Sequence, residues 1–312
     1  MGDVRATGAK ALCARVAGPD NDAARILYYA EVMGIGAQAS GDDQVFDLGP
    51  GGAEVEALAD AVMAGFGQLS PAVVRRRLGS LRVEAASRIR AAGAARRGLR
   101  LGGGGVTVAA MRQAHAGFLA LDLLDLTHDR FDGGTSPVVR REVLVSGDAV
   151  TVLPYDPVRD RVLLVEQFRT GPLRRGDPLP WQLEAIAGRI DPGETPEDCA
   201  RREAAEEAGL VLGRLERVAE YYPSPGVVTE YIHSFVALCD LPDGSAGVFG
   251  QADEAEDIRG HLVAFDRFMA AVAEGEVANA PLILTALWLQ RERGRLRGQG
   301  TWADCPPYSR AT

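Results

Sequence analysis

Three glutamates, Glu203, Glu206 and Glu207, are spaced three and four residues apart in the segment 188–210. Positions i, i+3 and i+4 share one face of an α-helix, so the spacing predicts three neighbouring carboxylates. Like charges at this spacing repel each other, and a purely structural helix gains little from them. A hard cation such as Mg²⁺ prefers oxygen ligands and keeps water and phosphate oxygens around it. Taken alone, three such glutamates are more typical of a solvated acidic helix, and a metal–phosphate site is the alternative that the rest of the segment must support.

Local signals around these glutamates predict a helix from about Pro196 to Ala208. Thr195 is a favourable N-cap, and proline suits the first helical position that follows it. Gly209 is a natural residue to end the helix. Small residues on another face would allow close packing on a sheet, at Ala200, Ala204 and Ala208.

The first third of the chain differs in amino-acid composition from the rest. Residues 1–105 are rich in alanine, glycine and arginine, and helices are expected at 53–66 and 71–95, the second with Ser70 as N-cap. The many arginines of the second helix and its tail are interpreted as a solvated helix face: Arg75, Arg76, Arg77, Arg82, Arg88, Arg90, Arg96, Arg97 and Arg100. Four glycines at 102–105 predict a hinge.

From about residue 113 the sequence changes to short apolar runs separated by turns. Such runs are typical of strands, and their mixture with helices predicts an α/β layered domain. Strands are expected at 149–153 and 162–167 (as a hairpin), 181–187, 220–222, 231–238 and 261–265, and helices at 266–274 and 281–293, with an acidic loop at 241–257.

Composition excludes several classes of protein. The net charge of −9 argues against nucleic acid as a partner, and an acidic protein acting on a polyphosphate needs a cation to offset repulsion. No apolar run is long enough to predict a membrane span. The scattered cysteines fit no zinc spacing and indicate reduced thiols of a cytoplasmic protein: Cys13, Cys199, Cys239 and Cys305.

The whole segment resembles the Nudix box, G-x5-E-x7-R-E-U-x-E-E-x-G-U with U apolar, far more specifically than the glutamates alone. Every specified position matches: Gly188, Glu194, Arg202, Glu203, Ala204, Glu206, Glu207, Gly209 and Leu210. The resemblance to Nudix hydrolases implies an α/β/α sandwich with the box as a loop–helix–loop. It also implies hydrolysis of a nucleoside diphosphate linked to another moiety, with Mg²⁺ or Mn²⁺ as cofactor.

The resemblance also implies roles for particular residues. Arg202 would orient the glutamates by salt bridges, and Glu194 would pair with it. The implied metal ligands are Glu203, Glu207, Glu206 and the backbone carbonyl of Ala187.

A closer resemblance, over roughly residues 113–295, is to bacterial ADP-ribose pyrophosphatases, including the subgroup associated with tellurite resistance. It is carried by segments that include 131–133, 140–142, 153–160, 165–169, 224–226 and 252–259. Pro225 lies sixteen residues after Gly209, as that subfamily's marker proline does. The resemblance implies cleavage of ADP-ribose to AMP and ribose 5-phosphate. Alternatives are a GDP-mannose or other nucleotide-sugar pyrophosphatase, and a non-catalytic ADP-ribose sensor.

In these relatives the general base is a glutamate on a loop beyond the box, which implies Glu254 here with Glu256 as the fallback. Arg169 matches the position that reaches the diphosphate. Further substrate contacts are implied for Phe118, Arg141, Glu142, Pro225, Gly226 and Glu230. Phe118 would stack on the base from an extra N-terminal sheet of the Nudix domain, although a core aromatic is the alternative. Because that sheet is exchanged between subunits in the relatives, a homodimer is implied.

Residues 1–105 lie outside this resemblance. The segment 11–38 faintly resembles gamma-glutamylcyclotransferase-like domains, without their glycine-rich start. The region is therefore interpreted as a small, mostly helical accessory region, possessing no catalytic acid of that fold. The expected organisation is an accessory region at 1–105, a Nudix domain at 106–297 and a tail at 298–312.

Overall fold

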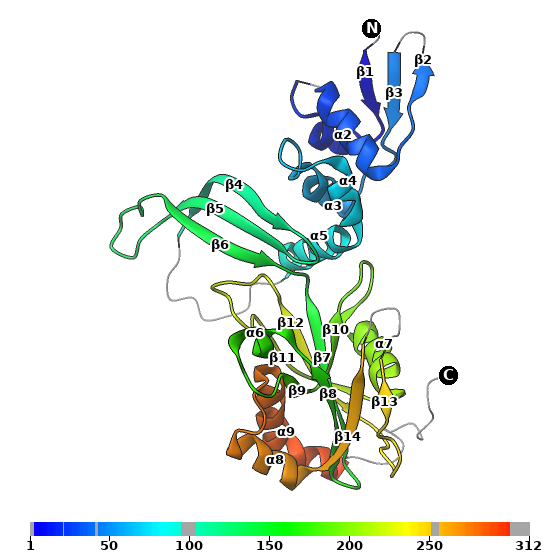
Figure 1. The fold of residues 1–312 in the computed structure, drawn as a ribbon, viewed down its shortest axis with the longest axis vertical. Coiled ribbons are helices and arrows are strands. Elements are labelled where there is room, and N and C mark those ends of the chain that lie inside the picture. Colours follow the sequence, from blue (N-terminus) through cyan, green and yellow to red (C-terminus); the bar gives the residue numbers. More distant parts are fainter. Residues whose placement is uncertain (1–2, 21, 41–42, 95–103, 251–255, 300–312) are drawn as a thin grey trace. The chain divides into compact units, whose positions relative to one another are not determined.

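The computed structural model describes residues 3–20, 22–40, 43–94, 104–250 and 256–299. Its contacts divide the chain into two compact units (Figure 1). The first comprises Met1–Gly147 and Ser224–Glu230, and the second comprises Asp148–Pro223 and Tyr231–Thr312. This boundary lies after the one expected near residue 105. Hydrogen bonds from Arg77 to Gln113 and Gly117, and from the Gln113 N–H to Gln68, join the strands at 106–145 to the N-terminal helices. Part of the predicted glycine hinge, at 102–103, lies outside the described ranges.

The N-terminal part of the first unit contains helices and a small sheet. Its elements are β1 (Val4–Thr7), α1 (Lys10–Ala17), α2 (Ala23–Met33), β2 (Gln38–Ser40), β3 (Asp43–Asp47), α3 (Ala53–Met63), α4 (Pro71–Arg76) and α5 (Leu78–Gly93). The sheet order is β1-β3-β2, with β1 parallel and β2 antiparallel to β3. The predicted helix at 53–66 is confirmed, whereas the three short strands were not predicted.

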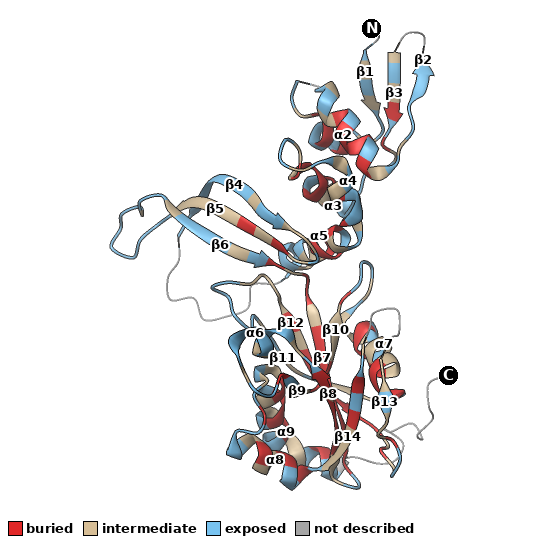
Figure 2. Ribbon diagram, viewed as in Figure 1, coloured by how far each residue is buried: buried red, intermediate tan, exposed pale blue. Residues whose placement is uncertain are grey.

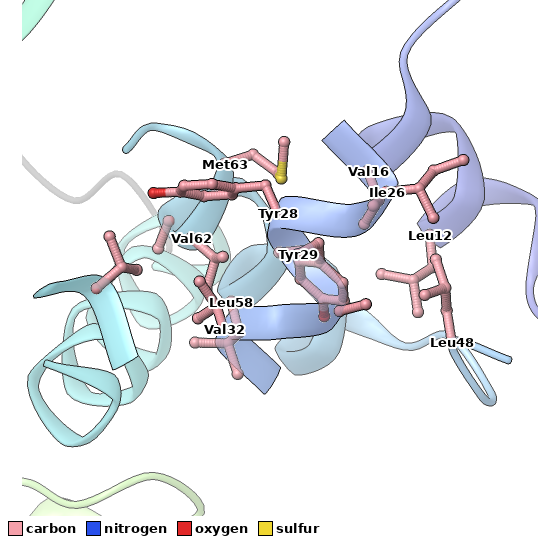
Figure 3. Close-up of a cluster of buried hydrophobic side chains, with 14 of the residues drawn as sticks. Leu12, Val16, Ile26, Tyr28, Tyr29, Val32, Leu48, Leu58, Val62 and Met63 are labelled. Atoms are coloured by element: carbon pink, nitrogen blue, oxygen red, sulfur yellow. The ribbon is translucent and has the colours of Figure 1, made fainter. Parts of the chain in front are cut away.

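This part of the unit has its own apolar core. Apolar residues from α1, α2 and α3 meet there, and Figure 3 shows Tyr28 and Tyr29 among them. Leu12, Val16 and Ile26 are completely buried. An enclosed core of this kind stabilises the helices by removing apolar surface from water. The described residues between 3 and 94 therefore fold as a packed structure.

A break at Arg77 divides the long helix that was expected at 71–95. Its backbone (φ −97°, ψ 6°) leaves helical geometry, so α4 ends at Arg76 and α5 begins at Leu78. Ser70 precedes α4 as predicted, but its side chain makes no capping hydrogen bond. The interpretation of the arginines as a solvated face is wrong at Arg77, which is only 6% exposed. Burial is tolerated because acceptors surround its guanidinium.

The first unit also holds an antiparallel meander of β4 (Val106–Ala116), β5 (Ala120–His128) and β6 (Val139–Val145). It corresponds to the extra N-terminal sheet that was predicted. The segment Ser224–Glu230 joins its edge: Leu144 N–H donates to the Val227 carbonyl (2.9 Å), and Thr229 N–H donates to the Leu144 carbonyl (3.0 Å).

The second unit is built on a mixed sheet with the strand order β11-β12-β7-β8-β14-β13. Strand β10 also pairs with β7, and β9 pairs with β8. The strands are β7 (Ala149–Asp156), β8 (Arg161–Phe168), β9 (Trp181–Glu184), β10 (Ile186–Arg189), β11 (Leu215–Tyr221), β12 (Ile232–Leu238), β13 (Val248–Phe249) and β14 (Ile258–Ala264). The hairpin of β7 and β8 is confirmed, but only its closing end pairs, at Tyr155↔Val162 and Asp156↔Arg161.

Helices cover both faces of this sheet, which confirms the predicted α/β/α sandwich. Helix α7 (Pro196–Ala208) packs its alanines against Val150, Val152 and Leu163. Helices α8 (Phe265–Glu274) and α9 (Ala280–Gln299) pack on alternate residues of the same strands. Figure 2 shows the resulting burial of the central strands. None of the helices in the described ranges is long and apolar enough to cross a membrane.

Candidate active site

Helix α7 presents the glutamates of the candidate site, and its ends have the expected caps. The Asp198 N–H donates to Thr195 Oγ1 (3.1 Å), and Gly209 ends the helix in the left-handed conformation (φ 61°). These contacts satisfy backbone groups that a helix end leaves open. The helix bounds agree with those predicted from the sequence.

Arg202 connects three of the carboxylates. Its guanidinium donates twice to Glu194, at 3.0 and 3.1 Å. Its Nη1 donates to Glu203 Oε1 (2.8 Å) and Glu206 Oε2 (3.0 Å). The hydrogen bonds to Glu194 are the first cause that raises the pKa of Arg202, so the guanidinium stays charged. The predicted contact between Arg202 and Glu194 is present, and the arginine fixes the neighbouring carboxylates in direction.

Glu207 is buried, at 3% exposure, and the side chain of Glu203 is mostly buried, at 12%. Burial raises the pKa of Glu207 to about 8, although its carboxylate accepts the Ala187 N–H at 3.1 Å. Burial likewise raises the pKa of Glu203 to about 7. The charge of Glu203 further raises the pKa of Glu207, so the two groups are close enough to repel. Ionising both requires additional positive charge.

Gly188 allows the close approach of strand β10 to helix α7. A Cβ atom at this position would lie 1.7 Å from Glu203 Oε1 and 2.0 Å from its Cδ. Contacts that short do not occur, so only glycine leaves room for the Glu203 carboxylate where it lies. The first residue of the motif is therefore explained by packing against the motif's own glutamate.

The donor set fits a divalent cation. Glu203 and Glu207 repel each other, and Glu203 shares the Arg202 guanidinium with Glu194 and Glu206. A divalent cation beside them would offset the remaining negative charge. Across the described ranges no three acidic, histidine or cysteine side chains are grouped so that they could hold a metal ion together, and this includes Glu203, Glu206 and Glu207. Mg²⁺ usually takes one or two protein carboxylates and completes its octahedron with water and substrate phosphate oxygens.

Arg169 supplies a positive group beside these carboxylates. It forms a two-point ion pair with Glu184, with Nε–Oε1 and Nη2–Oε2 distances both of 2.8 Å. This pairing is the first cause that raises the pKa of Arg169, with smaller contributions from Glu207 and Glu256. The guanidinium is therefore held by a buried glutamate within electrostatic reach of the candidate metal ligands. Such a group suits phosphate binding.

Of the two candidates for the general base, Glu256 is the one that lies among the described residues. Glu254 lies outside the described residues. Glu256 is described, and after burial its charge is among the smaller causes that raise the pKa of Glu203 and Glu207. Its carboxylate therefore lies within electrostatic reach of both glutamates.

The other predicted substrate-binding residues belong to the first compact unit. Phe118 is 71% exposed in the turn between β4 and β5, which is inconsistent with the core-aromatic alternative. Arg141 and Glu142 are neighbours on β6, opposite Leu124 and Leu123 of β5. Pro225, Gly226 and Glu230 lie in the segment attached to the edge of β6.

Two polar residues of the second unit were given no role from the sequence. Glu184 ends strand β9 and holds Arg169. Gln167 is 7% exposed, and its buried Nε2 has no hydrogen-bond partner within the described parts of the chain. Side chains alternate along a strand, so Gln167 shares the face of Val165 and Arg169, beneath α7. In the sequence, both could have been noticed as polar residues within otherwise apolar strands.

Comparison with known proteins gives consistent results. Residues 145–284 match the NUDIX domain. The chain is 41% identical over 198 residues to an ADP-ribose pyrophosphatase of Escherichia coli (strain K12), covering 64% of this chain and 93% of the relative. It is 38% identical over 190 residues to an ADP-ribose pyrophosphatase of Haemophilus influenzae, covering 60% and 86% of the two chains.

More distant matches include a GDP-mannose pyrophosphatase of Salmonella choleraesuis, 36% identical over 151 residues, with coverage of 48% of this chain and 78% of the relative. A solved structure of an ADP compounds hydrolase is 23% identical with a TM-score of 0.47, covering 65% of this chain and 99% of its own. Because nearly the full length of the Escherichia coli relative aligns at 41% identity, and the NUDIX domain spans the glutamate helix, the chain belongs to the Nudix family.

Proposed function

We propose that this protein hydrolyses ADP-ribose to AMP and ribose 5-phosphate with Mg²⁺, for which Mn²⁺ can substitute. The observation that carries the proposal is the pair of carboxylates with raised pKa values, buried Glu207 and mostly buried Glu203, on the helix beside Gly188. The similarity to ADP-ribose pyrophosphatases at 38–41% identity supports the choice of substrate. A cation between these carboxylates and a diphosphate would offset the charge of both.

In this proposal Glu203 and Glu207 would hold the metal, with Glu206 and the Ala187 carbonyl as further ligands. The cation would supply positive charge to the diphosphate and lower the pKa of an attacking water. Arg202 keeps the carboxylates of Glu203 and Glu206 directed toward one another through its hydrogen bonds. The helix therefore binds and orients, and moving the proton requires another group.

We assign the proton-accepting role to Glu254, with Glu256 as the alternative. A general base must reach the attacking water, and the electrostatic influence of Glu256 on Glu203 and Glu207 supports a role near the proposed ligands for Glu256 itself. Arg169, held in place by Glu184, would bind the diphosphate with its charged hydrogen-bond donors.

The adenosine end would be bound by residues of the first unit. Exposed Phe118 offers an aromatic face for stacking on the base. Arg141 and Glu142 supply charged groups from strand β6, and Glu230 adds another from the adjoining segment. Pro225 and Gly226 shape the turn of that segment.

We further propose a homodimer in which the β4–β6 sheets are exchanged between subunits. Large apolar side chains are exposed on and beside this sheet, and burial between copies would remove them from water. They are Val106, Val108, Met111, Phe131 and Val138. Light scattering is expected to give twice the chain mass of 33.1 kDa; a single-chain mass would contradict the exchange.

A GDP-mannose pyrophosphatase is the second candidate, favoured by the 36% identity to such an enzyme. Incubation with Mg²⁺ and ADP-ribose, GDP-mannose or NADH, followed by quantification of released AMP and GMP, distinguishes the two. We expect the highest kcat/KM with ADP-ribose. Preference for GDP-mannose would reassign the substrate, whereas binding of ADP-ribose without any turnover would identify a sensor.

The same assay tests the general base. Glu254→Gln is expected to lower kcat for ADP-ribose by about 10²- to 10⁴-fold with little change in KM, because proton transfer typically contributes that much. Glu256→Gln is measured beside it, because Glu256 is the alternative base and the variant removes an equal charge two residues away. If only the Glu256 variant is slow, the role belongs to Glu256; full rates in both would refute a base on this loop.

Mg²⁺ is expected to raise the Tm of the protein more at about pH 8.5 than at about pH 6. The pKa of Glu207 is about 8 in the fold, above its ordinary value of 4.5. The metal-free fold therefore retains a proton that the unfolded chain releases, and its stability falls as pH rises through that interval. Ionised carboxylates bind metal more strongly, so added Mg²⁺ restores more at high pH. Equal Tm shifts at both pH values, measured by calorimetry, would contradict this linkage.

A further inference from the structure

Arg77 is a buried arginine at the junction of α4 and α5, outside the segment that resembles ADP-ribose pyrophosphatases. Three acceptors surround its guanidinium, each at 3.0 Å: Nε donates to the Gly117 carbonyl, Nη1 to Gln113 Oε1 and Nη2 to Glu84 Oε1. Its charge is balanced by Glu84, whose side chain is 7% exposed. The arginine therefore joins the helices to strand β4 and to the turn that follows it.

A second set of contacts extends this connection across the sheet. Gln113 Nε2 donates to Asp122 Oδ1 of β5 (3.2 Å), and the Gln113 N–H donates to Gln68 Oε1 (3.2 Å). Gln68 in turn donates to the Ala64 carbonyl at the end of α3 (3.2 Å). Asp122 is 7% exposed. Asp122 is buried and Gln113 half-buried, whereas Gln68 is exposed at the rim of this network. The linked hydrogen bonds fix one arrangement of helices and strands.

Helix α5 also packs beside β6, which is the other edge strand of the sheet, at the same end of the sheet. A Cβ at Gly147, just after β6, would lie 2.2 Å from Val83 Cγ1 of α5, so the two backbones approach closely. Ala120, which begins β5 and pairs with Val145 of β6, is completely buried. The N-terminal helices therefore hold the end of the sheet at which the β4–β5 turn lies.

We propose that Arg77 is a positioning residue for nucleotide binding. It fixes the three-residue turn Gly117–Leu119 through the Gly117 carbonyl, and the next residue in that turn is Phe118. This inference rests on the proposed function, in which Phe118 stacks on the base. The N-terminal region then sets affinity for the nucleotide end of the substrate without touching it.

Arginine suits this task because its planar guanidinium offers donors in several fixed directions at once. A lysine has a single ammonium on a flexible stem and cannot keep all three acceptors in the same geometry. Pre-ordering the turn reduces the conformational freedom that binding must remove. The effect is therefore expected on KM and not on the chemical step.

The test is steady-state kinetics with ADP-ribose on the full-length protein and Arg77→Met. KM is expected to rise about tenfold, within the range for loss of base stacking, while kcat stays within about twofold. Arg77→Lys should give an intermediate KM. Arg76→Met is the matched control, since Arg76 is the exposed neighbour. Because Arg77→Met leaves the Glu84 charge buried, Arg77→Met/Glu84→Leu serves if the single variant does not fold.

A double-mutant cycle with Phe118→Ala identifies the route of the effect. If Arg77 acts through Phe118, Arg77→Met adds no further rise in KM to the Phe118→Ala protein. An undiminished rise in KM in the Phe118→Ala protein, or an unchanged KM in a folded Arg77 variant, would overturn the positioning role of Arg77 and leave the proposed function standing. A wild-type protein that does not cleave ADP-ribose would instead overturn the proposed function, and the positioning role with it.

Discussion

Replacing Glu203 by glutamine is expected to lower kcat for ADP-ribose hydrolysis about a thousandfold or more. Glutamine keeps the size of the side chain but removes the negative charge that a cation requires. Metal assistance of this kind contributes several kcal/mol, and each 1.36 kcal/mol corresponds to tenfold in rate. The variant should also bind Mg²⁺ more weakly, as measured by titration calorimetry. The reason is that the carboxylates of Glu203 and Glu207 would together balance the charge of the cation.

Glu197→Gln provides the matched control for this variant. Glu197 lies on the same helix, but its side chain is 43% exposed and pairs with Arg217. Exposed pairs of this kind contribute about 0–1 kcal/mol to stability, so activity and Tm should change little. Turnover by Glu203→Gln at the wild-type rate would refute the metal-site assignment.

Helix α7 shows how much local sequence can predict. Its bounds followed from Thr195, Pro196 and Gly209, because caps and turn preferences depend on neighbouring residues alone. The pairing of Arg202 with Glu194 was implied by the Nudix resemblance and is present in the fold.

Features that depend on distant contacts were not predictable in this way. The apolar run at 181–187 looked like one strand, yet it divides at Ala185 because β9 pairs with β8 and β10 pairs with β7. Strands β1 to β3 are too short for a recognisable alternation. Arg77 looked like its exposed neighbours, and only the approach of β4 and Glu84 explains its burial.

Gly188 illustrates the same limit within the site itself. The motif identified the residue, but the reason for glycine lies in the distance to Glu203, fifteen residues later in the chain. Its φ angle is not positive, so the requirement is for space and not for backbone freedom.

Gly188→Ala is accordingly expected to lower kcat about a hundredfold or more, because the Glu203 carboxylate must leave its place and a displacement of about 1 Å can cost that factor. The added methyl group would lie 1.7 Å from Glu203 Oε1. Gly171→Ala is the matched control, since a Cβ there meets nothing within 4 Å. Steady-state kinetics of both variants measures the difference, and wild-type kcat in Gly188→Ala would contradict the steric argument.

Combining Gly188→Ala with Glu203→Gln tests whether the glycine acts through that carboxylate. If it does, the double variant is no slower than Glu203→Gln, because the group that the methyl displaces no longer binds metal. Multiplying effects would instead mean that alanine disturbs β10 itself, including the Ala187 N–H that Glu207 accepts. The two outcomes therefore distinguish two roles for Gly188. In one it only leaves space for the Glu203 carboxylate, and in the other it maintains the whole of strand β10 beside the helix.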